Sequence, residues 1–151
     1  MTQAEQKILL QDLCARLPYD IMCEVFDPQQ EYEEDVFNAH LIQIDAWTSH
    51  CYFWGCSETD PYDIEQVKPY LRPMSSMTKE ECIELGNIEA TIEGISKVIP
   101  NVPYYIEVAS SKQIDWLNRK MFDYRGLIPM GLALEAPEGM YNFKKTRNLK
   151  Y

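Results

Sequence analysis

From position 17 to position 67 the chain lacks lysine and arginine altogether, a gap of fifty-one residues. The same stretch contains twelve of the 24 acidic residues, and the formal net charge of the whole chain is −10. Basic side chains supply most of a protein's affinity for nucleic acid, and basic clusters likewise attract anionic membranes. We therefore expect no direct binding to nucleic acid or to a membrane. An acidic segment is expected instead to face a basic surface of a protein partner.

The chain also lacks a long hydrophobic run. No stretch of the sequence approaches the roughly 20 apolar residues that a membrane-spanning helix requires. Residues 1–7 are polar and lack the apolar core of a secretory signal. These two absences predict a cytoplasmic protein.

Catalytic motifs are equally scarce. The sequence has only two histidines, His40 and His50, and contains no GxSxG, GxGxxG or Walker pattern. Nucleophilic catalysis needs a serine or cysteine together with a histidine and an orienting acid, and no such set is recognisable. We therefore expect no catalytic residue and no cofactor, and nothing in the sequence requires an enzyme.

The five cysteines include no CxxC pair. Zinc sites usually use closely spaced pairs of Cys or His, and the nearest approach is His50, Cys51 and Cys56. Adjacent residues of a strand face opposite sides of the sheet, so this group does not favour a metal site. Cys14, on an apolar helix face, and Cys23 and Cys51, in strand-like runs, are expected to pack as small hydrophobic residues.

What is present favours one globular domain. The chain has 151 residues, of which 46% are hydrophobic and 25% charged, as in ordinary soluble domains. We expect a single α+β domain over residues 1–142 and a frayed basic tail over residues 143–151.

Three capping boxes predict the helix starts. Thr2 with Glu5, Thr78 with Glu81 and Ser110 with Gln113 each pair an N-cap hydroxyl with an acidic or amide side chain three residues later. Apolar residues follow each box at helical spacing, as does a further apolar stripe over residues 88–99.

Strand patterns lie mostly in the acidic half. We expect strands over residues 21–26, 36–47, 50–56 and 104–108, with a hairpin turn at Thr48 and Ser49. In the second strand, Leu41, Gln43 and Asp45 should alternate with residues 42, 44 and 46. The expected architecture is an N-terminal helix and a three- to four-stranded antiparallel sheet, with two to three helices packed on one face.

Two further segments are less regular. Residues 67–77 contain two prolines and are interpreted as an extended crossover from sheet to helix, or as a recognition strip. Residues 122–141 are apolar but are broken by glycines and prolines, which predicts an irregular tract packed on the body of the domain. Trp54 and Trp116 are expected in the core.

Three sequence strings resemble an uncharacterised family of small proteins from gut Bacteroidetes phages and mobile elements. They are LLQDLCARLPY at 9–19, KPYLRPMSSMT at 68–78 and DYRGLIPMGLALEAPEGMY at 123–141. Relatives in that family often have paired histidines near the position of Asn118, where this chain has Arg119 and Lys120. The resemblance implies a phage or mobile-element protein working in a bacterial cytoplasm, and it implies no activity.

We therefore expect a non-catalytic acidic interaction protein that binds a host or phage protein. One version of this hypothesis is that it mimics the charge of nucleic acid or inhibits a defence system. The expected partner-binding acids are Glu31, Glu33, Glu34, Asp35, Asp60, Asp63 and Glu65. The tract near the C-terminus supplies a possible docking surface formed by Tyr124, Arg125, Leu127, Ile128 and Met130.

Two alternatives stay open. One is a metal-dependent hydrolase in which Asp60, Asp63 and Glu65 converge with His50 or with His40, which is expected across a hairpin from His50. The other is a purely structural or accessory role. The sequence leaves the oligomeric state undetermined.

Overall fold

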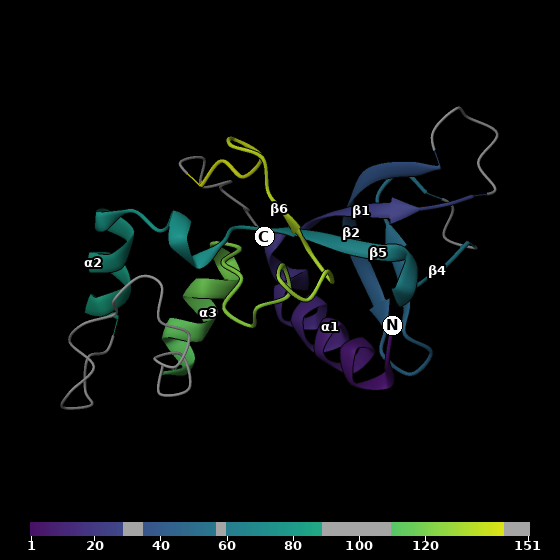
Figure 1. The fold of residues 1–151 in the computed structure, drawn as a ribbon, viewed down its shortest axis with the longest axis horizontal. Coiled ribbons are helices and arrows are strands. Elements are labelled where there is room, and N and C mark those ends of the chain that lie inside the picture. Colours follow the sequence, from purple (N-terminus) through teal and green to yellow (C-terminus); the bar gives the residue numbers. More distant parts are fainter. Residues whose placement is uncertain (29–34, 57–59, 89–109, 144–151) are drawn as a thin grey trace, which may run out of the picture.

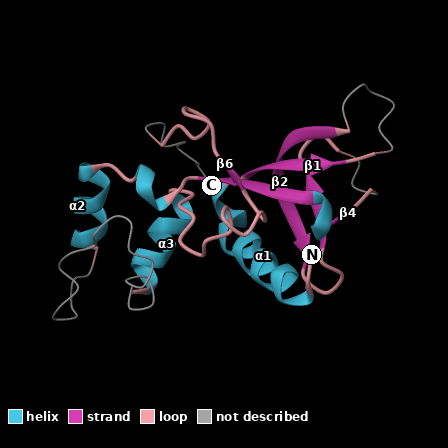
Figure 2. Ribbon diagram, in the orientation of Figure 1, coloured by secondary structure: helices cyan, strands magenta, loops and turns pink. Residues whose placement is uncertain are grey.

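The computed structural model describes residues 1–28, 35–56, 60–88 and 110–143. The protein is α+β, with an N-terminal helix, a mostly antiparallel six-stranded sheet and two further helices (Figures 1 and 2). The α-helices and strands are α1 (Gln3–Arg16), β1 (Met22–Phe26), β2 (Val36–Asp45), β3 (His50–Phe53), β4 (Tyr62–Asp63), β5 (Val67–Leu71), α2 (Lys79–Asn87), α3 (Ser111–Arg119) and β6 (Leu134–Glu135). Short 3-10 turns are η1 (Leu17–Tyr19), η2 (Ile64–Gln66) and η3 (Met74–Ser76).

All three predicted capping boxes are confirmed. Thr2, Thr78 and Ser110 each accept the backbone N–H three residues later, and the side chain there accepts the N-cap N–H in return. The boxes satisfy backbone donors that a helix start otherwise leaves unpaired. The helix starts were therefore fixed by local sequence.

The sheet has more strands than the sequence predicted. Its order is β4-β3-β2-β1-β5-β6, with antiparallel pairs except between β5 and β6. The segment expected to be a crossover contains β5, whose Val67, Lys68 and Pro69 pair with β1. Proline inside a run argues against a central strand. Pro69 is tolerated here because it has a strand on one side only: it pairs with Cys23 of β1, and β6 on the other side pairs with Tyr70 and Leu71, which follow the proline.

The connection between β4 and β5 forces the sheet to curl. These strands lie four positions apart in the sheet but are joined only by the three residues of η2. In a flat sheet, four strand spacings would separate them by about 19 Å. The four Cα steps from Asp63 to Val67 reach at most about 15 Å even when fully extended. The first five strands therefore bend into a partly closed barrel.

Polar and aromatic contacts close this bend. Tyr62 on β4 donates a hydrogen bond of 3.0 Å to Asp27, which follows β1, and Gln66 donates one of 2.9 Å to the Phe26 carbonyl. The Tyr62 ring also meets Phe37 and Phe53 edge-on, at centroid distances of 5.7 and 5.8 Å. Burial, together with the hydrogen bond to Asp27, raises the pKa of Tyr62.

Replacing Tyr62 by phenylalanine tests this closure. Tyr62→Phe keeps both ring contacts and leaves the Asp27 carboxylate without this donor, so we expect a loss of about 1–2 kcal/mol in the free energy of unfolding. Urea denaturation of Tyr62→Phe beside Tyr52→Phe, whose ring faces outward, measures it. Equal midpoints for the two variants would show that the hydroxyl does not hold the bend.

Of the three described α-helices, α1 is the one that covers the sheet. Leu9 and Leu13 of α1 pack with the inner-face residues of the strands in the main core. The other two helices depart from the expected arrangement, because Leu85 of α2 and Trp116 of α3 cluster with Phe122 in a second core beside the sheet (Figure 1). Trp116 is buried as predicted.

The buried face of α1 differs from its predicted apolar stripe. Cys23 and Cys51 are buried as expected, but Cys14 is exposed. The positions facing the core include Asp12 and Arg16, each with 0% exposure. The expectation for Cys14 was wrong because Cys14 lies on the side of α1 opposite to its buried residues, which are Leu9, Asp12, Leu13 and Arg16.

This ion pair joins α1 to the C-terminal tract. Arg16 donates from Nε and Nη2 to the Asp12 carboxylate at 2.8 and 2.9 Å, and from Nη2 to the Phe122 carbonyl at 2.7 Å. Arg125 donates to Asp12 Oδ1 at 2.7 Å. One buried carboxylate thus bridges two guanidinium groups from segments more than a hundred residues apart in the chain.

Asp12 is therefore expected to be the most sensitive member of this network. Asp12→Ala leaves two guanidinium groups uncompensated, and breaking a buried pair in this way costs about 3–5 kcal/mol. Arg125→Met should cost less, because Arg125 is 25% exposed and Asp12 keeps Arg16. Thermal and urea unfolding of both variants measures the difference. A larger loss for Arg125→Met would contradict the assignment of Asp12 as the centre.

Several sequence predictions fall outside the described residues. They are the helical stripe beyond residue 88, the strand at 104–108, the basic residues 144–151, and the acidic residues Glu31, Glu33 and Glu34. Within the described part of the chain, no helix has the length and hydropathy needed to span a bilayer.

Candidate protein-binding surface

A bulge in β2 turns two consecutive residues outward. Leu41 pairs with Phe53 and Gln43 with Tyr52, so Ile42 is an extra residue in β2. Leu41 is buried, whereas Ile42 and Gln43 are both exposed. The predicted strict alternation fails here because a bulge shifts the register by one residue.

The neighbouring strand β3 alternates regularly. Cys51 and Phe53 face the core, and Tyr52 and Trp54 face outward. The Trp54 N–H donates to the His40 carbonyl at 2.9 Å, which extends the ladder by one residue past β3. Trp54 is 74% exposed, so its predicted core position was wrong. Residues 51–54 are all apolar or aromatic, so the sequence has no alternation there that could have placed Trp54.

Ile42, Tyr52 and Trp54 form what we call the tryptophan patch. They lie on the outer side of β2 and β3, opposite the inner face that packs against α1. Ile42 is 47% exposed, and Tyr52 is half-buried. An exposed tryptophan beside further apolar and aromatic area is typical of protein-binding sites, where tryptophan is enriched among the residues that dominate affinity.

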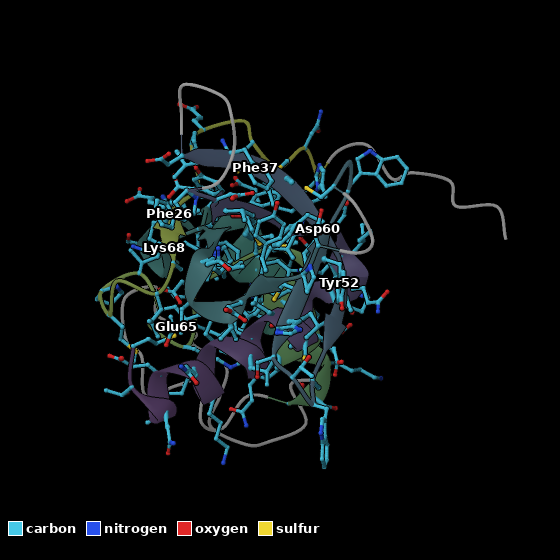
Figure 3. The ribbon with its side chains drawn as sticks, turned by 90° about the vertical axis from the view of Figure 1, so that its right-hand side faces the viewer. Phe26, Phe37, Tyr52, Asp60, Glu65 and Lys68 are labelled. Carbon is cyan, nitrogen blue, oxygen red and sulfur yellow. The ribbon has the colours of Figure 1, made fainter. Side chains whose placement is uncertain are left out.

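Acidic side chains lie on the side of the molecule that carries Tyr52 of the tryptophan patch. Asp60 is exposed and lies on the same side of the molecule as Tyr52, whereas Phe26 and Lys68 lie on the other side (Figure 3). Asp63 on β4 pairs with His50, which lies on the outer face two residues before Tyr52. Lys68, the first basic residue after Arg16 in the sequence, thus lies on a different side of the molecule from Tyr52.

A second exposed tryptophan lies at the tip of the β2–β3 hairpin. The hairpin turn falls at the predicted position, and Trp47 within it is 97% exposed. Asp45 accepts hydrogen bonds from the backbone N–H groups of Thr48 and Trp47, which lower its pKa and keep it ionised. The tip is therefore an ordered, negatively charged turn.

The residues of the hydrolase alternative do not converge. His40 pairs with Asp20 at 3.1 Å, and His50 pairs with Asp63 at 3.2 Å. His40 lies opposite Trp54 rather than across from His50, which pairs with Asp45 along β2. Among the described residues, no group of three or more His, Cys, Asp or Glu side chains is placed to hold a metal ion.

Cys51 is not arranged as a nucleophile. It faces the core, and burial raises the pKa of its thiol to about 12. His50, its neighbour in sequence, faces the other side of the sheet. A thiol is nucleophilic as the thiolate, so Cys51 stays unreactive near neutral pH.

The described members of the predicted acidic set are spread over the fold. The Asp35 carbonyl accepts the Asp27 N–H at 2.7 Å, where β1 and β2 meet. Glu65 accepts a hydrogen bond of 2.6 Å from Gln6 on α1 and lies away from Asp60 in Figure 3. Of this set, Asp63 is placed on the strand next to β3, and Asp60 lies on the side of Tyr52 in Figure 3.

The predicted docking tract is mostly structural. Leu127 is fully buried, Arg125 pairs with Asp12, and Tyr124 donates to Asn118 at 2.9 Å. The backbone N–H of Ile128, which is half-buried, is held by the carboxylate of Asp123. Met130, at 41% exposure, is the tract residue most available to a partner.

Comparisons of this chain with protein-family models, with curated proteins and with solved structures found no match.

Quenching of tryptophan fluorescence tests both the exposure and the local field. Two of the three tryptophans, Trp47 and Trp54, are exposed among acidic residues, and Trp116 is buried. Quenching of the protein's fluorescence by each ion is compared with quenching of free N-acetyltryptophanamide by the same ion. On this scale we expect caesium to be the more effective quencher of the protein and iodide the less effective one. The difference should shrink as added salt shortens the screening length. Equal relative quenching by both ions at low salt would contradict a negative field at these side chains.

Proposed function

We propose that this chain is an interaction protein that binds another protein through the tryptophan patch. The observation that carries the proposal is the 74% exposure of Trp54 beside Ile42, on a sheet surface that α1 leaves uncovered. Burying a tryptophan on a partner contributes strongly to affinity, because its large ring is rigid and desolvates readily. Leaving it exposed contributes nothing comparable to folding.

The proposed form is direct binding rather than charge mimicry. Mimicry of nucleic acid needs acidic groups in one ordered row, and the described acids are divided among separate partners: Asp20 with His40, Asp63 with His50, and Glu65 with Gln6. The resemblance to phage and mobile-element proteins supports a bacterial host or phage protein as the proposed partner. No described feature favours the hydrolase alternative over binding.

Capture from bacterial lysate with matched variants tests the proposal. Wild type, Trp54→Ala and the control Ile83→Ala are compared, because Ile83 is a similarly exposed apolar residue on the distant helix α2. We expect a defined partner with wild type and with Ile83→Ala. Its affinity, measured afterwards with the purified partner, should fall about thirtyfold or more for Trp54→Ala, as for a dominant interface residue.

Circular dichroism and thermal unfolding of the variants serve as folding controls. An exposed side chain at this position contributes little to stability, so Trp54→Ala should unfold within a few degrees of wild type. A partner that binds wild type and Trp54→Ala equally would refute the tryptophan patch as the binding surface.

A further inference from the structure

Aromatic rings elsewhere in this protein are paired with its own cations. Arg72 lies 4.2 Å from the centroid of Phe122, Arg125 lies 4.5 Å from that of Tyr124, and Arg119 lies 5.6 Å from that of Tyr19. These three arginines thus lie over rings of η1 and of the C-terminal tract. Among the described residues, none of these cations reaches the Trp54 ring.

The surroundings of Trp54 favour a cation supplied from outside. The sequence around it contains no lysine or arginine from position 17 to position 67. Asp60 is exposed on the side of Tyr52, and Asp63 is 72% exposed on the adjoining strand β4. A cation on an indole face is attracted by the ring, and neighbouring carboxylates add to that attraction.

Resting on the proposed function, we infer that the occupant of the tryptophan patch is an arginine-bearing segment of the partner, with a guanidinium packed on the Trp54 indole. Arginine is preferred to lysine because its planar, weakly hydrated group stacks on aromatic rings. A second copy of this chain is disfavoured, because two copies would bring the same acidic surroundings together at a net charge of −10 each.

Trp47 offers the natural comparison. It is more exposed than Trp54 and lies near Asp45, but it occupies a turn without the apolar area that Ile42 and Tyr52 provide beside Trp54. A stacked guanidinium needs a surface against which the rest of its segment can pack. The inference therefore assigns the larger effect to Trp54.

Calorimetric titration with a capped octa-arginine peptide tests this inference without the natural partner. We expect Trp54→Ala to weaken binding about two- to fivefold, the range of a cation–π contact at an exposed site, and Trp47→Ala to weaken it less. A capped octa-lysine peptide should bind wild type more weakly than octa-arginine does. Equal affinity of octa-arginine for wild type and Trp54→Ala would overturn the stacked arrangement.

Charge variants separate a local contact from diffuse attraction. The double variant Asp60→Asn/Asp63→Asn is compared with the double variant Glu80→Gln/Glu138→Gln. Both remove two negative charges, but the second removes them from exposed sites on α2 and on the C-terminal tract. We expect the first pair to weaken octa-arginine binding more than the second. Equal effects would show that only net charge matters and would overturn the inference.

The natural partner distinguishes failure of this inference from failure of the proposed function. If partner binding requires Trp54 but does not change between about 0.05 and 0.5 M salt, the occupant is apolar, so the inference is wrong and the proposed function stands. If partner binding does not require Trp54, both are wrong. Binding that needs Trp54 and weakens with salt supports both.

Discussion

The short connection between β4 and β5 is the constraint on which the rest of the sheet depends. Three residues of η2 join strands that a flat sheet would hold too far apart, so the sheet must bend until Tyr62 meets Asp27. Bending encloses the inner face, on which α1, the strands and residues of the C-terminal tract such as Leu127 form the main core. It also makes the outer side chains diverge, which is why Tyr52 and Lys68 lie on different sides of the molecule.

A second interaction connects this curled sheet to the rest of the chain. Asp12 and Arg16 lie on the buried face of α1. Arg16 donates a hydrogen bond to the Phe122 carbonyl, and Asp12 pairs with Arg125, both in the C-terminal tract. Beside it, Arg72 at the end of β5 pairs with Glu81 of α2 through two bonds of 2.9 Å. A fully buried pair such as Asp12 and Arg16 gives little net stability over apolar packing, but it tolerates few alternative arrangements. It fixes how the tract lies against α1.

The division of charge follows the same architecture. Arg72 and Lys120 lie over aromatic rings of the second core, whereas the sheet half carries acids and two exposed tryptophans. Part of the positive charge is thus held over the protein's own aromatic rings, whereas Trp54 and Trp47 stay exposed on the sheet half beside acidic residues. This asymmetry connects the fold to the proposed interaction.

The sequence by itself determined the local features. The capping boxes at Thr2, Thr78 and Ser110, the hairpin turn near Thr48 and the α+β class follow from short-range patterns, because capping and turn chemistry act within a few residues. Tertiary structure alone decided the strand role of Val67–Leu71, the bulge at Ile42, the outward direction of Trp54 and the burial of Arg16. These depend on pairing and burial between segments distant in the chain, and such contacts leave no periodic signal in the sequence.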